Sequence, residues 1–462
     1  MNALRQRLPA PRQDQAARQA RKNGGAEGGK DGYEPSRIAQ LAQEAPIWYR
    51  SAARRRLYFL LFPAAIVSYA TSGYDGSRMN SLQTVSYWDD FFDNPRGAQL
   101  GLMSAIMSLG SICSTPIAPW VADKYGRRMG ITVGSLIMII GAILQCESHN
   151  FGMFVGSRFV LGFGLSFATT SAPSLVSELS HPKDRVTVTA ICNTCWFVGS
   201  IAAAWITYGT RNIQSTWSWR LPSLLQMAPS IIQLSTIWFL PESPRWLISN
   251  DCGEEAMEAL KQYHGEGGET ELVRLEFEEI RAAIDHEKRS GTTTWPSMVR
   301  TKGNRYRMFL VVCMGFMSQW SGNGLVAYYL SRVMDTVGIT DKNTQALVNG
   351  LINIWNFGLA LTTAFFVERI GRRPLFRAST LGMLTVPIGL ENIGWRFYLV
   401  YVAILAVESF IAYGWFLETK GKALEEIAVI FDGEAADVRM DEGKKLEGLV
   451  DVEETENVHR KV

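Results

Sequence analysis

The residues most able to do chemistry in this sequence are charged side chains inside apolar stretches. Asp75 stands at the end of the first apolar stretch, and Arg158 stands near the start of the fourth. A carboxylate at the centre of a bilayer costs about 2.5–3.5 kcal/mol on insertion scales, so an ionisable residue there is a functional candidate by default. A second interpretation stays open for each residue. Asp75 would then lie at the outer membrane surface, and Arg158 would be an anchor at the cytosolic surface.

Other kinds of chemistry find little support. Cys192 and Cys195 form a CxxC pair, but no second pair or histidine cluster accompanies it, so we expect buried apolar cysteines and no metal site. No nucleophile and base are spaced as in a hydrolase, which argues against an enzyme and against a cofactor. The net charge of +2 is not concentrated in a basic face, so nucleic acid is not an expected partner.

The elements that position these residues are predicted to be membrane-spanning helices. Charged residues make up only 19% of the 462 residues, and the apolar ones gather in stretches long enough to cross a bilayer. The sequence therefore predicts an all-α polytopic membrane protein of about ten spans, six before a polar stretch and four after it. The candidate spans are 57–75, 98–120, 129–146, 152–174, 187–208, 219–240, 308–330, 345–367 and 395–417, with a weaker run at 377–390.

Basic residues near the span ends predict the orientation. They cluster before the first span and after the second, fourth and eighth, at Arg54, Arg55, Arg56, Lys124, Arg127, Arg128, Lys183, Arg185, Arg369, Arg372, Arg373 and Arg377. Both termini and the central polar loop are therefore expected in the cytosol. Within that loop, residues 253–288 are expected to form amphipathic helices. The predicted organisation is a disordered tail (1–56), a six-helix bundle (57–241), a cytosolic loop (242–307), a shorter C-terminal bundle (308–418) and a second tail (419–462).

An internal repeat indicates two related halves. Asp123 begins the pattern acid, two residues, Gly, Arg, Arg after the second span, and Glu368 begins the same pattern after the eighth. Transporters are often built from such repeats, with the binding site between the halves near the bilayer midplane. The alternative is two independent positively charged loops, but the matching acid and glycine favour a repeat.

Further motifs, in order along the chain, resemble the sugar porter family of the major facilitator superfamily, in particular its fungal lactose-permease-like branch. The resemblance covers about residues 50–430. Its motifs are Gly73-Tyr74-Asp75, Gly156-Ser157-Arg158, Pro241-Glu242-Ser243-Pro244-Arg245-Trp246-Leu247, Gln319-Trp320-Ser321-Gly322, Tyr328-Tyr329 and Glu418-Thr419-Lys420-Gly421. The resemblance implies a two-bundle fold and transport of a solute at a fungal plasma membrane.

The sequence departs from this family after the ninth predicted span. Family members have twelve spans, whereas Leu384 matches the ninth and the residues from Val386 onward match the entrance to the twelfth. About two spans of the C-terminal bundle are therefore expected to be missing. The family's proline before Glu418 is replaced by Leu417. A native transcript with about 80 additional codons would mean that the missing spans were lost from the predicted gene.

The resemblance also implies roles for individual residues. Asp75 matches the aspartate that takes up the proton in proton-coupled sugar porters, and Arg158 matches the arginine that faces it. Sugar contacts are implied at Asn193, Gln319, Asn323, Tyr328, Tyr329 and Asn356, where amides and aromatic rings suit hydroxyls and apolar sugar faces. Each of these side chains has an alternative reading as a packing residue or an interhelical hydrogen bond.

Charged loop residues match the family's cytosolic gate, in which salt bridges between the half-bundles close the inner side. They are Asp123, Arg127, Arg128, Glu178, Arg185, Glu242, Arg245, Glu368, Arg372 and Arg373. The sequence therefore predicts a secondary transporter that imports a hexose or a disaccharide such as lactose by proton symport. The expected partners are the sugar, the proton and the lipid bilayer. A sugar sensor of the same family and a truncated product that does not transport are the alternatives.

Overall fold

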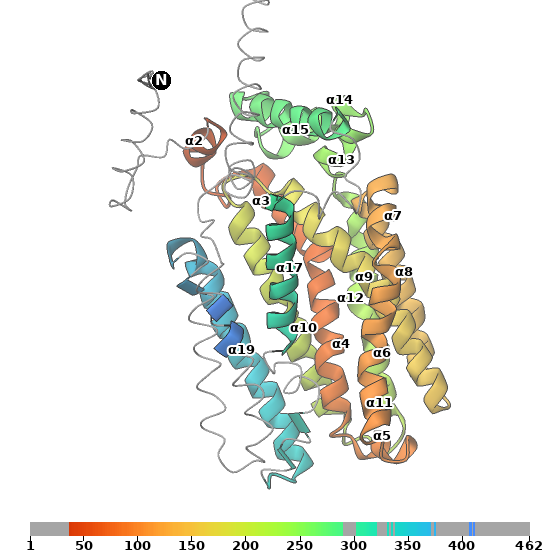
Figure 1. The fold of residues 1–462 in the computed structure, drawn as a ribbon. Helices are drawn as coiled ribbons and strands as arrows, with labels where there is room; N and C mark the ends of the chain where they lie inside the picture. The colour runs from red at the N-terminus through yellow and green to blue at the C-terminus, as the bar shows by residue number, and fades with distance from the viewer. Residues whose placement is uncertain are drawn as a thin grey trace, which may run out of the picture.

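A computed structural model of the chain describes residues 37–289, 302–320, 330–331, 334–335, 338–370, 374–375, 406–408 and 410–411. These residues form helices and their connections. Figure 1 shows long helices running side by side, with a layer of shorter helices across one end. The predicted all-α class is therefore confirmed for the described part of the chain. The predicted spans 377–390 and 395–417 lie almost entirely outside the described residues.

The first predicted span belongs to a longer continuous helix. It comprises α3 (Ala52–Leu61), a π-helical turn η1 (Phe62–Ile66) and α4 (Val67–Leu82). Pro63 in η1 lacks a backbone N–H, and a π turn accommodates this break in the hydrogen-bond ladder. The composite helix of 31 residues is long and apolar enough to cross a membrane. The span predicted at 57–75 is therefore present, and it continues for a further turn or two at each end.

Part of the segment expected to be a disordered tail is ordered. Residues 37–44 form α2 (Arg37–Glu44), and the hydroxyl of Ser51 accepts a hydrogen bond from the backbone N–H of Arg54 at the start of α3. The prediction of disorder across 1–56 was thus wrong for 37–56. The physical reason is tertiary: α2 packs on α15 (Glu271–Arg289), and Arg37 forms an ion pair with Glu271 of that helix at 3.0 Å.

The next four predicted spans are also found. After the short α5 (Ser86–Phe91) come α6 (Ala98–Ser114) and α7 (Ile117–Tyr125), which bend by 47° relative to each other, followed by α8 (Arg127–Cys146), α9 (Phe151–Leu179) and α10 (Arg185–Thr210). Among the described residues, four helices pass a length and hydropathy test for spanning, or five if α6 and α7 form one bent span.

The sixth predicted span, 219–240, is divided into three pieces. These are α11 (Trp217–Leu225), α12 (Met227–Thr236) and the 3-10 turn η2 (Ile237–Phe239). The run of helical backbone continues through Gln226, whose φ of −60° and ψ of −24° remain in the right-handed helical region. The division therefore marks a local irregularity within one helical rod.

The helices approach one another closely where glycines replace larger side chains. A Cβ atom added to Gly73 of α4 would lie 1.7 Å from the carbonyl oxygen of Trp196 in α10, and one on Gly199 would lie 1.8 Å from that of Ala70. Small residues allow this backbone-to-backbone contact between membrane helices. Each helix of the α4–α10 pair therefore contributes a glycine against which the backbone of the other helix packs.

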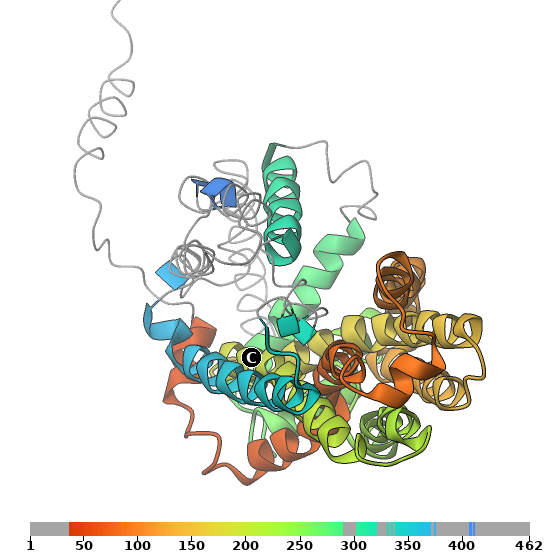
Figure 2. The same ribbon diagram turned by 90° about the horizontal axis from the view of Figure 1, so that it is seen from below.

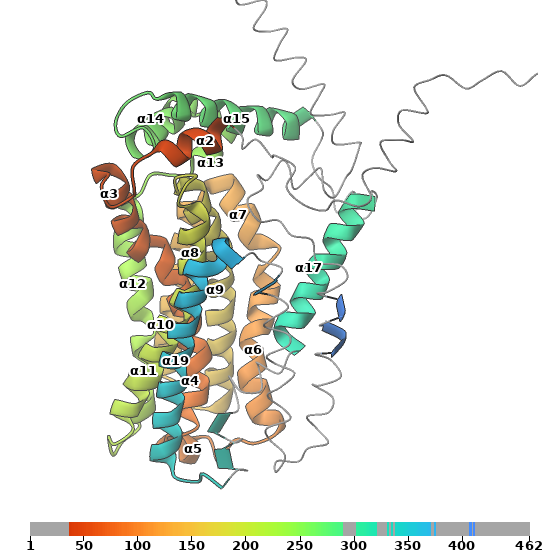
Figure 3. The same cartoon turned by 90° about the vertical axis from the view of Figure 1, so that its left-hand side faces the viewer.

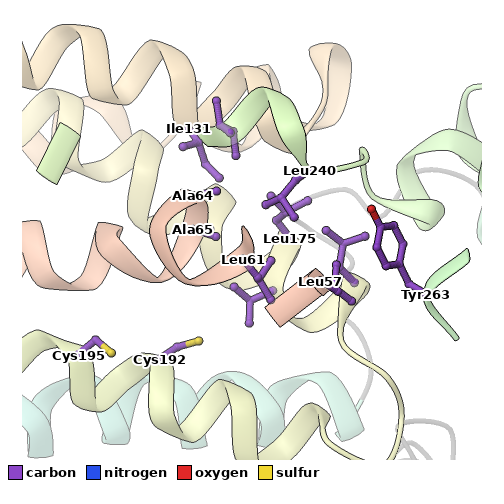
Figure 4. Packing of buried hydrophobic residues seen from close by; sticks show 14 residues of the cluster. Leu57, Leu61, Ala64, Ala65, Ile131, Leu175, Cys192, Cys195, Leu240 and Tyr263 are labelled. Carbon is purple, nitrogen blue, oxygen red and sulfur yellow. The ribbon is translucent and has the colours of Figure 1, made fainter. Parts of the chain in front are cut away.

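A hydrophobic cluster joins the spans to the layer of short helices. Figure 4 shows side chains from α3, η1, α8, α9, α10, the connection after η2 and α14 meeting here, namely Leu57, Leu61, Ala64, Ala65, Ile131, Leu175, Cys192, Cys195, Leu240 and Tyr263. Cys192 and Cys195 are buried as free thiols in this cluster. Their role as small apolar side chains is thereby confirmed.

The layer at the end of the bundle contains α13 (Pro244–Ser249), α14 (Gly253–Tyr263) and α15 (Glu271–Arg289), as Figures 1 and 3 show. The amphipathic helices predicted at 253–288 are thus confirmed. Their apolar faces meet in a cluster of Leu247, Ile248, Ala256 and Ile284, while their other faces carry charged residues.

Two long helices of the C-terminal half are described. They are α17 (Lys302–Trp320), which covers the first part of the span predicted at 308–330, and α19 (Lys342–Ile370), which contains the span predicted at 345–367. In Figure 2, α19 lies against the N-terminal bundle, where it packs on α10. This contact between the halves positions the polar residues of α19 that are described below.

Candidate functional site

The structure brings Asp75 and Arg158 together inside the N-terminal bundle. Asp75 lies on α4 and Arg158 on α9, each 1% exposed, and Nη2 of Arg158 is 3.4 Å from Oδ2 of Asp75. The carboxylate of Asp75 is therefore enclosed by protein, whether it lies near the outer membrane surface or deeper in the bilayer. The guanidinium of Arg158 is likewise enclosed by protein. The role of the pair in proton coupling stays a prediction.

Two further side chains that the sequence analysis did not identify complete this cluster. Arg78 donates from Nη2 to Oδ1 of Asp75 at 2.8 Å, and Gln226 donates from Nε2 to the same oxygen at 3.0 Å. Arg78 is 0% exposed. Its position three residues after Asp75, on the same face of a helix, was a signal that could have revealed it. Gln226 gave no local signal because its contact spans 151 residues of sequence. We call these four residues the Asp75 cluster.

Only some of the predicted sugar-contact residues can be placed. Asn193 is exposed on α10, and Asn356 is half-buried on α19, the helix that packs against α10. Gln319 lies at the end of α17, but its side chain is outside the described set, as are Asn323, Tyr328 and Tyr329. The described structure thus supplies two amides on neighbouring helices from opposite halves, and the complete sugar site remains a prediction.

A band of neutral polar residues joins the two halves. Asn349 of α19 accepts from Nδ2 of Asn80 at 3.1 Å and donates to the hydroxyl of Ser81 at 3.1 Å. Asn353 accepts from the hydroxyl of Ser200 in α10 at 2.7 Å. All five side chains are buried. We call this group the amide seam.

The seam was missed although it left a trace in the sequence. Asn349, Asn353 and the predicted Asn356 follow one another at intervals of four and three residues, which places them on one face of α19. A stripe of amides on an otherwise apolar helix indicates a polar neighbour. Beside the seam, Nζ of Lys342 donates to the carbonyl oxygen of Gln83 at 3.0 Å.

The predicted gate residues of the N-terminal half gather at the opposite end, close to α13. Nη1 of Arg127 is 2.8 Å from Asp123, and its Nε is 3.4 Å from Glu178. Glu242 accepts hydrogen bonds from the backbone N–H groups of Arg127 and Arg128 at 3.1 and 3.2 Å. These carboxylate contacts cap the first turn of α8, where unpaired N–H groups and the helix dipole favour a negative charge. We call these five residues the gate cluster.

The described gate contacts lie within one half of the molecule. The acid partners of Arg127 come from α7, α9 and the segment before α13, and Arg185 pairs with Glu276 of α15 at 3.3 Å. Arg245 is exposed on α13. The side chain of Glu368, together with Arg372 and Arg373, lies outside the described residues, so the expected bridges between the half-bundles are not tested. What the described part shows is a network that ties the N-terminal bundle to its own loop helices.

A second charged group at this end contains two buried histidines that the sequence analysis did not single out. Nδ1 of His264 is 2.7 Å from Glu276, and its Nε2 is 3.1 Å from the carbonyl oxygen of Leu179. The ring of His181 lies 5.3 Å from that of His264. Arg54 of α3 pairs with Asp184, which follows His181, at 3.6 Å. We call this group, with Arg185, the histidine junction.

The surroundings of the two histidines shift their pKa values in opposite directions. Burial lowers the pKa of His181 to about 3, with help from the neighbouring His264 and Arg54. Burial also acts to lower the pKa of His264, but the charge and hydrogen bond of Glu276 outweigh it and hold that pKa above the ordinary value. The surroundings therefore favour the neutral form of His181 and the protonated form of His264.

Comparison with known proteins places the chain among transporters. Residues 60–388 match the sequence profile of the family described as sugar (and other) transporter. The high-affinity glucose transporter of Kluyveromyces lactis is 28% identical over 70% of this chain and 58% of its own length. The MFS-type transporter criB of Aspergillus cristatus is 27% identical over 78% of this chain and 90% of its own length. This chain thus spans little more than half of the first relative.

Solved structures support the fold. A double-tryptophan variant of XylE, the xylose transporter of E. coli, superposes with a TM-score of 0.71 at 18% sequence identity. The match covers 82% of this chain and 99% of that chain. At this identity the likeness shows the fold alone, which this chain shares with XylE.

Proposed function

The chain belongs to the sugar (and other) transporter family, and on this premise we propose that it imports a neutral sugar across the plasma membrane by alternating access coupled to protons. The observation that carries the proposal is the enclosed ion pair between Asp75 and Arg158, formed by helices of the same bundle. The partners in this proposal are the sugar, a proton and the bilayer, with both termini in the cytosol.

Asp75 is the proton-binding group in the proposed mechanism. Its carboxylate is the acceptor for donors from α4, α9 and Gln226. Adding a proton would remove the negative charge that stabilises the facing guanidinium groups, and an unpaired buried charge is strongly unfavourable. The helices that carry these groups would therefore repack, which links proton entry to movement of the half-bundles.

The amide seam is the contact that opens and closes in this proposal. It lies between α4 and α10 of one half and α19 of the other, and its members are uncharged. An amide or hydroxyl exchanges a protein partner for water at a modest net cost of about 0.5–1.5 kcal/mol per hydrogen bond. A seam of this kind suits halves that must separate in every transport cycle.

The proposed substrate is a hexose, with a disaccharide as the broader alternative. The relative from Kluyveromyces lactis is named a glucose transporter, and further relatives from Saccharomyces cerevisiae are named hexose transporters. Asn193 and Asn356 supply amide groups from the two halves. Neutral amides suit a neutral polyol because they both donate and accept hydrogen bonds.

The test is sugar accumulation in proteoliposomes that contain the full chain, with a pH gradient as the driving force. We expect labelled glucose to accumulate in the wild type, and Asp75→Asn to abolish accumulation while exchange of sugar across the membrane continues. Asp90→Asn, at an exposed site on α5, is the matched control and should accumulate sugar normally.

Two results would contradict the proposal in different ways. Unchanged accumulation by Asp75→Asn would remove the coupling role from this residue. No uptake by correctly inserted wild-type protein, with any hexose or lactose, would favour a sensor or a product that does not transport.

A further inference from the structure

The Asp75 cluster carries more positive than negative charge. Two guanidinium groups, from Arg78 and Arg158, face the single carboxylate of Asp75, while Gln226 is neutral. Among the described residues, Asp75 is the acidic side chain that contacts either guanidinium. With Asp75 ionised, the cluster therefore has a net charge of +1.

The two arginines that carry this charge have N–H groups without a hydrogen-bond acceptor in the described part of the chain. Each arginine directs Nη2 to Asp75, and for both residues Nε and Nη1 are buried without a hydrogen-bond partner in the described structure. Nη2 of Arg158 also lies 3.9 Å from the sulfur of Met107, a weak acceptor. The two side chains are 0% and 1% exposed, so bulk water does not solvate these groups.

A buried net charge of +1 is unfavourable unless a negative charge lies beside it. Buried charges in proteins are paired because removing an ion from water is costly, and inside a membrane such groups pair with one another or face a polar cavity. A guanidinium offers several N–H groups in a rigid plane that suits oxyanions and halides, and such charge-assisted hydrogen bonds are the strong ones. One monovalent anion would bring the cluster to neutrality.

We propose that a small monovalent anion binds beside Asp75, held by the free Nε and Nη1 groups of Arg78 and Arg158. Two sources share this chemistry: a free halide such as chloride, and the carboxylate of an acidic sugar. The proposed site shares Arg158 with the proposed proton-coupling pair, but it uses the arginine atoms that Asp75 leaves unpaired. It also needs no transport activity to be detected.

Binding to the purified full chain tests the proposal. We expect radioactive chloride to bind with a stoichiometry near one per chain. Replacing methanesulfonate by saturating chloride at constant ionic strength should raise the unfolding temperature by at least about 2 °C, since a ligand that binds only the folded state stabilises it. Arg78→Leu should lose both effects. Arg37→Leu, at an exposed arginine, should retain both.

Galacturonate and galactose distinguish the two sources. A shift with chloride that Arg78→Leu loses identifies a free anion. A shift with galacturonate but not with chloride or galactose, again lost in Arg78→Leu, identifies the carboxylate of an acidic sugar. If Arg78→Leu does not fold, Arg78→Lys keeps the charge but not the planar fork, and should bind the anion at least about tenfold more weakly.

Absence of any anion effect on the wild type, in both binding and unfolding, overturns the proposal. So does an effect that persists unchanged in Arg78→Leu. Failure of sugar uptake leaves these measurements intact, which separates this proposal from the proposed function.

Discussion

The amide seam and the gate cluster lie at different places in the molecule and use different chemistry. The seam joins the two halves through neutral side chains such as Asn349 and Asn353. The gate cluster joins helices of one half through ions, with Arg127 between two acids. Neutral hydrogen bonds exchange with water at small net cost, whereas separating Arg127 from Glu178 would leave two charges that are partly withdrawn from water, at 14% and 18% exposure. The difference indicates that the amide seam suits halves that separate, whereas the gate cluster suits helices that stay together.

The largest effect on stability is expected from replacing Glu242, which caps the start of α8. Glu242→Ala removes the acceptor for three backbone N–H groups, those of Arg127, Arg128 and Ser243. We expect a loss of about 1–3 kcal/mol in unfolding free energy, since α8 loses a cap and partly buried N–H donors are left unpaired. Thermal unfolding of the purified protein measures it, with the exposed Glu258→Ala as the control. Equal stability of the two variants would mean that the gate cluster does not hold its helices.

The histidine junction predicts that the attachment of the loop helices is strongest in a window near neutral pH. The lowered pKa of His181 contributes stability that is complete above its ordinary value of about 6.5, and that falls by about 1.4 kcal/mol per unit as the pH drops toward its folded value. The raised pKa of His264 contributes stability that is complete below about 6.5 and is lost as the pH rises through its folded value.

Unfolding temperatures measured from pH 5 to 9 test both contributions. His181→Gln should reduce the loss of stability on the acid side of the profile, and His264→Gln should reduce the loss on the alkaline side. His149→Gln, at an exposed site, should leave the whole profile unchanged. A profile that keeps both losses of stability in both variants would show that other groups set the pH dependence.

A smaller effect on stability is expected at the seam. Asn353→Ala removes the acceptor of Ser200, so we expect the closed state to lose about 1 kcal/mol, a roughly fivefold shift in population toward separation of the halves. Labelling of a cysteine placed at Ser81, in a background without the native cysteines, should accelerate by that factor. Asn343→Ala, exposed at the start of α19, should label as the parent does. Unchanged labelling in Asn353→Ala would mean that the seam does not control separation.

The smallest effect is expected where an ion pair is exposed. Arg37 contacts both carboxylate oxygens of Glu271, but both side chains are more than half exposed. Arg37→Ala should change the unfolding free energy by less than about 1 kcal/mol, and less still at high salt. A larger change, insensitive to salt, would show that α2 is held by something other than this pair.

The sequence predicted the elements better than the contacts between them. Hydropathy placed the ends of the first five spans within about two helical turns, and periodicity placed α14 and α15. It did not predict the division of the sixth span at Gln226 or the ordering of α2. Burial of one face decides whether a long helix forms, and this leaves a periodic signal. Packing of α2 on α15 depends on residues more than 230 positions away and leaves none.

The same limit applies to the site. The pairing of Asp75 with Arg158 was implied by the family resemblance, and no property of either residue alone would have indicated it. Gln226 and His264 become meaningful only when folding brings them to Asp75 and Glu276. Arg78 and Asn349 were accessible in principle, because helical spacing links them to residues that had been named. Charged and amide side chains at such spacing on apolar helices merit attention in related sequences.

The pairing of Arg78 with Asp75 has a consequence for biosynthesis. The two residues are one helical turn apart on α4 and form an ion pair at 2.8 Å, so this helix supplies its own counter-charge. The chain is made from its N-terminus, and α4 leaves the ribosome well before α9 with Arg158. Without Arg78, the first span would enter the bilayer carrying a carboxylate with no partner. With it, α4 can be inserted as an electrically neutral helix before the later spans have been synthesised.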